Sequence, residues 1–170
     1  MKYDFIIVGS GIIGLTLAYK LKKKFNNGKI LILEKEKDSI QHGSGRNSGV
    51  IHSGIYYEPG SLRATLGVQG GRELKEYIKS KRLWIDECGK ILVPTSQNSY
   101  ENTEQLFARG IENGVVIKKL SGEQIANLEP NINNKYNIGL HVPFTSIADP
   151  KEVSKSLIGD LIDLGVEIQY

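Results

Sequence analysis

The chain has 170 residues, 39% hydrophobic and 24% charged, which is enough for a domain with a real core. Its net charge of +3 is too small to indicate a nucleic-acid-binding protein, so no such partner is expected. Cys88 is the only cysteine, which excludes an intrachain disulfide and fits a reducing compartment. No apolar run approaches the length that crosses a bilayer.

The first predicted elements form a βαβ unit. An apolar run over residues 3–8 predicts a buried parallel strand, which leads into a G-x-G-x-x-G loop at residues 9–14. The helix that follows is expected to place Ile13, Leu17 and Leu21 on its apolar side. A second strand over residues 29–33 ends at Glu34, at the distance from the loop that is typical of a dinucleotide-binding fingerprint.

Each part of this fingerprint has a physical task. Gly9 permits a tight turn, Gly11 lets the backbone approach a pyrophosphate, and Gly14 permits close packing of the helix on the strand. The helix N-terminus offers N–H groups to phosphates, and Glu34 can accept hydrogen bonds from a ribose. A glycine-rich turn in an ordinary βαβ unit is the alternative. The residues expected to contact a dinucleotide here are Gly9, Gly11, Ile12, Ile13, Gly14, Glu34 and Lys35.

Residues 38–60 form a long predicted loop rich in Gly, Ser, His and Asn, and loops of this length in compact domains are usually functional. Its glycines let the backbone pass close to a flat ligand, and its polar side chains can form hydrogen bonds with that ligand. A flexible polar loop is the alternative. The candidate cofactor-binding residues of this loop are His42, Ser44, Arg46, Asn47, Ser48, Gly49 and Val50.

The rest of the chain mixes helices and strands. We expect helices over residues 61–81, 101–113 and 153–164, and a further helix that starts at residues 121–124. We expect strands over 89–94, 115–117 and 139–143, and a last strand that starts at residues 165–168. Trp84 and Cys88 are expected to be buried. Because strict alternation ends near residue 88, we expect an α/β fold: a Rossmann-like domain (residues 1–88 and 147–170) with an inserted α+β lobe (89–146). A doubly wound domain needs more strands than these, so we expect a fragment of a longer protein.

Residues 46–57, together with 59–62, closely resemble the L-2-hydroxyglutarate dehydrogenase/oxidase family, FAD-dependent enzymes of the D-amino-acid-oxidase-like superfamily. Further matches are residues 68–70, 88–90, 113–115 and 129–131. The chain departs from the family at Arg63, where a lysine is usual, and at Ser146, Ala148 and Pro150. These departures concern the substrate assignment more than the cofactor.

The resemblance implies FAD as the cofactor and oxidation of L-2-hydroxyglutarate to 2-oxoglutarate by hydride transfer to the flavin, with a quinone or oxygen as electron acceptor. His52 is the first candidate for the catalytic base, and a purely structural histidine is the alternative. Arg63 and Tyr56 are candidate substrate-binding residues. No metal-ligand cluster is recognised in the sequence.

Other functions stay open at this stage. The altered segment 146–150 is compatible with an FAD-dependent oxidase or dehydrogenase of an amino acid, a secondary amine or glycerol 3-phosphate. An inactive nucleotide-binding fragment and an enzyme that uses NAD as substrate are further alternatives. We expect a cytoplasmic protein. Lys20 and Lys22–Lys24 fall at the end of the first predicted helix, where we expect them to complement the helix dipole and face solvent; adhesion to an anionic membrane surface is the alternative. The sequence leaves the oligomeric state open.

Overall fold

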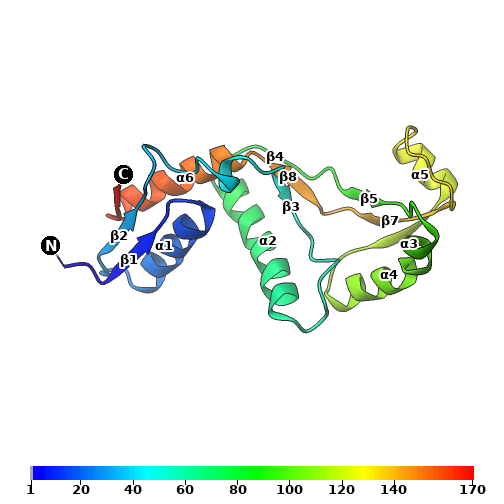
Figure 1. The fold of residues 1–170 in the computed structure, drawn as a ribbon, viewed down its shortest axis with the longest axis horizontal. Helices are drawn as coiled ribbons and strands as arrows, with labels where there is room; N and C mark the ends of the chain where they lie inside the picture. The colour runs from blue at the N-terminus through cyan, green and yellow to red at the C-terminus, as the bar shows by residue number, and fades with distance from the viewer. Residues whose placement is uncertain (1) are drawn as a thin grey trace. The chain divides into compact units, whose positions relative to one another are not determined.

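The structure is a computed structural model that describes residues 2–170 (Figure 1). The chain divides into two compact units. The first comprises the chain up to Gly49, together with Lys81–Leu83 and Ala148–Tyr170, and the second comprises Val50–Ser80 and Trp84–Ile147. The first boundary thus lies at Gly49, whereas we expected one at residue 88. The assignment of domains to functions, 1–88, 89–146 and 147–170, stays a prediction.

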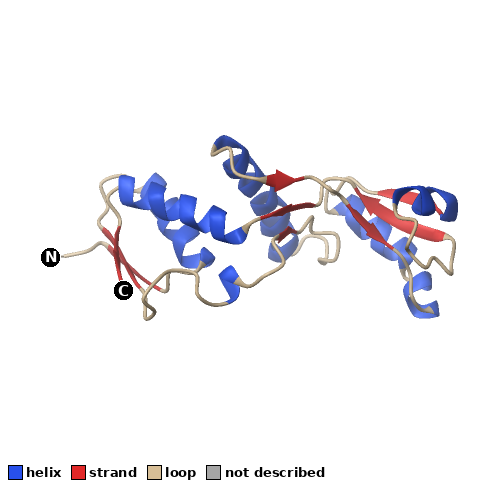
Figure 2. Cartoon of the chain, turned by 90° about the horizontal axis from the view of Figure 1, so that it is seen from above, coloured by secondary structure: helices blue, strands red, loops and turns tan. Residues whose placement is uncertain are grey.

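The first unit is a three-stranded parallel sheet with helices packed on it. The sheet has the order β1-β2-β9, and Ile6 of β1 pairs with Leu31 of β2, whose Ile32 pairs with Ile168 of β9. Helices α1 and α6 pack against each other beside this sheet, as Figures 1 and 2 both show. The elements of this unit are β1 (Phe5–Val8), α1 (Ile12–Lys24), β2 (Ile30–Leu33), the short 3₁₀ helix η1 (Gly43–Gly45), α6 (Pro150–Asp163) and β9 (Glu167–Gln169).

This arrangement confirms the predicted βαβ start and the return of the last strand to the parallel sheet. Ile30, Leu31 and Ile32 are all buried, as expected for a strand covered on both faces of a parallel sheet. Helix α6 begins three residues earlier than predicted because Asp149 caps it. Its Oδ1 accepts hydrogen bonds from Lys151 N at 2.7 Å and Glu152 N at 3.4 Å, and a proline follows as the first helical residue.

The buried face of α1 differs from the expected one. Leu15 and Ala18 are completely buried, whereas Ile13 is 81% and Leu17 47% exposed. The reason is the close approach of helix to strand at Gly14, where a Cβ would lie only 2.0 Å from the carbonyl oxygen of Gly9. Small residues, rather than the largest apolar ones, therefore decide which side of the helix faces the sheet.

The second unit contains two three-stranded sheets, of orders β3-β8-β4 and β5-β7-β6, with antiparallel pairing of β3 with β8 and of β7 with both its neighbours. Its buried cluster is formed by Ile55, Val115, Ile117, Leu140 and Val142. The elements are β3 (Val50–Ile51), α2 (Leu62–Ser80), β4 (Ile85–Asp86), β5 (Lys90–Leu92), α3 (Gln97–Glu101), α4 (Thr103–Glu112), β6 (Lys118–Ser121), α5 (Gly122–Leu128), β7 (Ile138–Val142) and β8 (Ser146–Ala148).

Several expectations for this unit were wrong in detail. The strand predicted over residues 115–117 lies at Lys118–Ser121, and Val115 and Ile117 instead fill the core. Trp84 is 55% exposed because it directly precedes a two-residue strand, whose alternation places it on the face opposite Ile85. Cys88 is exposed as well. Within residues 2–170, no helix combines the length and apolar character that a membrane crossing requires.

Candidate functional site

The loop after β1 has the backbone geometry that its glycines were predicted to allow. Gly9 has φ of +100°, in the region that L side chains rarely adopt, and its N–H donates to Leu33 O at 2.7 Å. Gly14 is essential for a different reason, because any Cβ there would collide with the Gly9 carbonyl. The loop therefore turns sharply from the strand into a helix that starts immediately against it.

The N-terminus of α1 carries backbone donors without intrahelical partners. Gly11 is the N-cap and provides no side-chain cap, and the first intrahelical bond runs from Leu15 N to Gly11 O at 3.0 Å. The N–H of Ile12 donates to Ser44 Oγ at 3.0 Å, and a Cβ on Gly11 would lie 3.1 Å from the same oxygen. The structure thus brings Ser44 of the polar loop onto the glycine-rich turn.

Glu34 lies at the carboxyl end of β2, beside this turn. Its Oε2 accepts hydrogen bonds from Ser10 Oγ at 2.7 Å and Ser10 N at 2.8 Å, and its Oε1 accepts one from Glu36 N at 3.0 Å. These bonds, led by that of the Ser10 hydroxyl, lower the pKa of Glu34 to about 2, so the carboxylate is ionised at neutral pH. A carboxylate has about four acceptor positions, so Glu34 keeps the capacity to accept from a ligand hydroxyl.

The polar loop that follows is held by its own side chains. Asn47 Nδ2 donates to Ser44 O at 2.9 Å, and its Oδ1 accepts from Gly49 N at 2.8 Å. His42 Nε2 lies 2.9 Å from Glu36 Oε1, while the predicted contact residues Lys35, Arg46 and Ser48 are exposed. Gly49 has φ of +72°, and Val50 is the first residue of β3, in the second unit.

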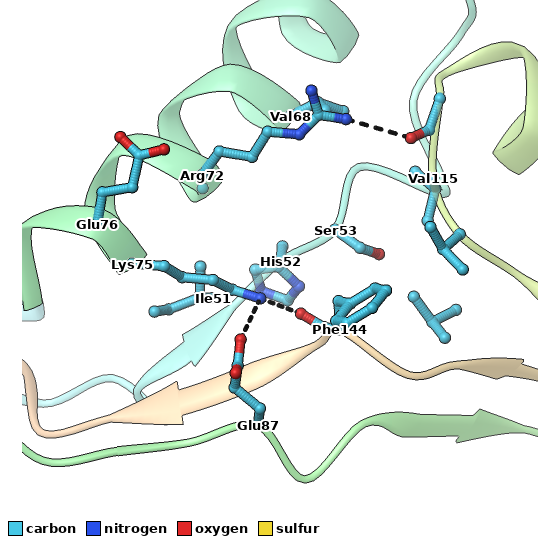
Figure 3. Close-up of a pocket in the computed structure, with 14 residues that line it drawn as sticks. Ile51, His52, Ser53, Val68, Arg72, Lys75, Glu76, Glu87, Val115 and Phe144 are labelled. Carbon is cyan, nitrogen blue, oxygen red and sulfur yellow. Dashed lines mark hydrogen bonds and ion pairs between the residues drawn. The ribbon is translucent and has the colours of Figure 1, made fainter. Parts of the chain in front are cut away.

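The second unit contains a pocket of about 310 Å³ beside His52 (Figure 3). His52 follows the buried Ile51 of β3 and is itself exposed, so its imidazole is accessible from the pocket. Two cations from one side of α2, Arg72 and Lys75, also line this pocket. Figure 3 shows the Lys75 amine directed toward Glu87 and Phe144.

Contacts on the pocket wall hold the two cations in place. Lys75 Nζ donates to Phe144 O and lies 3.8 Å from Glu87 Oε1, while Lys79 Nζ lies 3.0 Å from Glu87 Oε2. Burial lowers the pKa of Lys75, and the Glu87 charge opposes that shift only in part. Arg72 Nη2 donates to Gly114 O at 3.3 Å.

The remaining predicted residues lie at different places. Tyr56 is 48% exposed and lines a smaller cavity that also borders His52. Arg63 is exposed, with its guanidinium carbon 5.9 Å from the centre of the Tyr57 ring, and it lines neither cavity. Sequence reasoning missed Arg72 and Lys75, although their spacing of three residues on a predicted helix already placed them on one face.

Comparison with known proteins gives a consistent result. A family model described as "FAD dependent oxidoreductase" (DAO) matches residues 4–170. The chain is 46% identical over 163 residues to the mitochondrial L-2-hydroxyglutarate dehydrogenase of Dictyostelium discoideum, covering 95% of this chain and 36% of that protein. It is 39% identical over 164 residues to the human mitochondrial L-2-hydroxyglutarate dehydrogenase, covering 96% of this chain and 35% of that protein.

A solved structure shares both sequence and fold with the chain. The FAD-bound L-alpha-glycerophosphate oxidase of Mycoplasma pneumoniae superposes with a TM-score of 0.88 at 32% identity, covering 99% of this chain and 45% of that one. The chain therefore spans little more than a third of the length of these curated relatives and under half of this solved structure.

Proposed function

Since the chain belongs to the family of FAD-dependent oxidoreductases, we propose that the protein oxidises L-2-hydroxyglutarate to 2-oxoglutarate. The observation that carries this proposal is the pocket lined by an accessible histidine and two cationic side chains, together with the carboxylates of Glu76 and Glu87. Oxidation of a 2-hydroxy dicarboxylate requires a proton acceptor for the hydroxyl group, which the histidine provides, and cations for the carboxylates, which the arginine and lysine provide. The names of the curated relatives, at 46% and 39% identity, support the same substrate.

The residues of the first unit fit an FAD molecule. Gly14 leaves no room for a Cβ, and a Cβ on Gly11 would lie 3.1 Å from Ser44 Oγ. Helix α1 presents N–H groups without intrahelical partners, and the Glu34 carboxylate keeps acceptor capacity. The glycine-rich turn and the N–H groups would hold the pyrophosphate, and the Glu34 carboxylate would hold the adenosine ribose. The remaining predicted contacts, from Lys35 through the polar loop to Val50, belong to the same proposal. When bound, the flavin supplies the hydride acceptor for this reaction.

His52 is the proposed base that accepts the hydroxyl proton of the substrate as C2 is oxidised. An imidazole is the usual proton acceptor in such reactions, and the side chain of His52 is exposed to the pocket. Its backbone is anchored next to Ile51, which is buried and pairs with Ser146 of β8. A fixed backbone with an accessible ring suits a group that must meet one substrate atom.

Arg72 and Lys75 are the proposed partners of a substrate carboxylate in the larger pocket. Glu76 and Glu87 also line this pocket, and Glu87 is shared between Lys75 and Lys79, so the proposed role rests on the position of the two cations and not on a surplus of positive charge. The partial burial of Lys75 strengthens its interaction with an arriving anion, since less water competes for the amine. The earlier candidate Arg63 has no comparable position.

The acceptor of the electrons is proposed to be a quinone or oxygen. We place the protein in the cytoplasm, with peripheral contact to a membrane if a quinone is used. A substrate of small-molecule size is consistent with the family and with a pocket of about 310 Å³.

A second candidate is oxidation of glycerol 3-phosphate. It is supported by the 32% identity and TM-score of 0.88 with the glycerophosphate oxidase. Phosphate and carboxylate both require cations, so the pocket by itself suits either anion.

A substrate panel tests the two candidates. In the flavin-loaded protein, L-2-hydroxyglutarate should give stoichiometric 2-oxoglutarate, whereas D-2-hydroxyglutarate and glycerol 3-phosphate should give no product. His52→Asn should lower kcat by about 100-fold or more while the protein keeps its flavin, because general base catalysis contributes about 10²–10⁴. Turnover of glycerol 3-phosphate instead would refute the proposed substrate, and an unchanged kcat in His52→Asn would refute the proposed base.

A further inference from the structure

A second, small cavity that also borders His52 is the basis of a further inference. Its volume is about 20 Å³, and it is lined by residues 52–57, Lys90 and Thr145. This is room for one water molecule or for one carboxylate oxygen. The small cavity and the larger pocket share His52 and Ser53 in their linings, so both border the histidine.

Thr145 marks this cavity as a binding site. The residue is 3% exposed, and its Oγ1 has no hydrogen-bond partner among the described residues. Its position is fixed by the backbone, because Thr145 N donates to Val142 O at 3.3 Å and its carbonyl accepts from Gly89 N at 2.9 Å. Buried hydroxyl groups are normally hydrogen-bonded, so this one keeps donor and acceptor capacity for an atom that enters the cavity.

Lys90 gives the cavity its charge. Its Nζ lies 3.1 Å from the Tyr56 hydroxyl and 4.7 Å from the centre of the Tyr56 ring. The preceding residue, Gly89, has φ of +73°, and a Cβ there would lie 3.0 Å from His141 Nε2, so the chain requires glycine just before this lysine. None of the described residues that line the cavity is acidic. A cation, hydroxyl groups and no carboxylate are the composition of an anion site.

We infer that Lys90, Tyr56 and Thr145 bind the substrate carboxylate that is attached to the reacting carbon. This inference rests on the proposed function. The carbon that bears the hydroxyl must lie next to His52, because this residue accepts the hydroxyl proton. The carboxylate attached to that carbon is therefore the group that can place an oxygen atom in the small cavity, which the same histidine borders. The rest of the molecule, with its second carboxylate, then extends into the larger pocket toward Arg72 and Lys75.

Three variants and one matched control test the assignment in the flavin-loaded protein. Lys90→Met removes the charge, and Tyr56→Phe and Thr145→Val each remove one hydroxyl. The control, Lys118→Met, removes an exposed lysine from β6, which belongs to the same sheet as the strand β5 that carries Lys90. The readouts are KM and kcat with L-2-hydroxyglutarate, the Kd of the unreactive dicarboxylate glutarate by calorimetry, and bound flavin by absorbance. L-2-hydroxybutyrate, which keeps the first carboxylate and lacks the second, serves as substrate or competitive inhibitor.

We expect Lys90→Met to raise KM and the glutarate Kd by about 10–100-fold, as for loss of a charge-assisted hydrogen bond. Each hydroxyl deletion should raise them by about 3–10-fold, and Lys118→Met should leave them within about twofold of the wild type. The penalty of Lys90→Met should be as large with L-2-hydroxybutyrate as with L-2-hydroxyglutarate. Flavin content should stay unchanged.

Other results would overturn the inference. Unchanged KM and Kd in Lys90→Met and Tyr56→Phe would mean that the cavity holds only water, and this conclusion stands even if Thr145→Val fails to fold. Loss of flavin instead of substrate affinity would assign the lysine to the cofactor. A penalty that disappears with L-2-hydroxybutyrate would assign it to the distal carboxylate. A wild-type protein that neither binds glutarate nor oxidises L-2-hydroxyglutarate would instead overturn the proposed function itself.

Discussion

Gly14→Ala tests the packing of the dinucleotide-binding loop, because it has two opposite effects on stability whose sizes can be estimated: a gain in helix propensity and a steric clash. Alanine is preferred over glycine inside a helix by about 1 kcal/mol. Against this, the new Cβ would lie 2.0 Å from Gly9 O, so the atoms must separate by about 1.4 Å to reach an ordinary contact of 3.4 Å. The Gly9 carbonyl cannot turn away easily, because the N–H of the same peptide group, that of Ser10, donates to Glu34 Oε2 at 2.8 Å.

Overpacking costs about 1–3 kcal/mol, and we take the upper end, about 3 kcal/mol, because the clash is with backbone. The net loss of stability is therefore about 2 kcal/mol, a fall in Tm of about 4–8 °C for a chain of this size. Urea and thermal unfolding measure it. Gly159→Ala, in the middle of α6 with no atom within 4 Å of its Cβ, is the matched control and should stabilise by about 0.5–1 kcal/mol. If both variants were equally stabilised, the close approach of α1 to β1 would be refuted.

Two further predictions concern the same unit. The pKa of Glu34 in the fold, about 2, is below its ordinary value of 4.5, so its carboxylate stabilises the fold above pH 4.5 and this contribution is lost as pH falls toward 2. Glu34→Gln should therefore be less stable than wild type in urea at pH 7, and the difference should shrink steadily as pH falls from 4.5 toward 2; a difference independent of pH would contradict the assigned hydrogen bonds. Leu15→Ala should cost about 2–5 kcal/mol because Leu15 is completely buried, and Ile13→Ala, at a residue 81% exposed, should change stability by less than about 0.5 kcal/mol. If Ile13→Ala lost more stability than Leu15→Ala, the helix face that we expected from hydrophobicity alone would be the buried one.

The fingerprint was predictable because its information is local. The glycine spacing and Glu34 lie within one βαβ unit, and the structure places them together as the pattern requires. The buried face of α1 was not predictable from apolar residues alone. Close packing at Gly14 turns Leu15 and Ala18 toward the sheet, and this depends on a contact between atoms rather than on hydrophobicity.

The small cavity could not be found from the sequence. Its residues come from the segment after β3, from β5 and from the turn before β8, and only the fold brings Tyr56, Lys90 and Thr145 together. The missing hydrogen bond of Thr145 has no signature in the sequence. His52 was a candidate from its segment, but the two cavities that it lines became visible only in the structure.

The most direct test of the proposed function is the visible absorption spectrum of the flavin-loaded protein before and after anaerobic addition of L-2-hydroxyglutarate. The account predicts a bound flavin whose oxidised band bleaches as the substrate is oxidised. A bound flavin whose band persists at saturating substrate would contradict the assigned reaction, and a protein that binds no flavin would contradict the assigned cofactor.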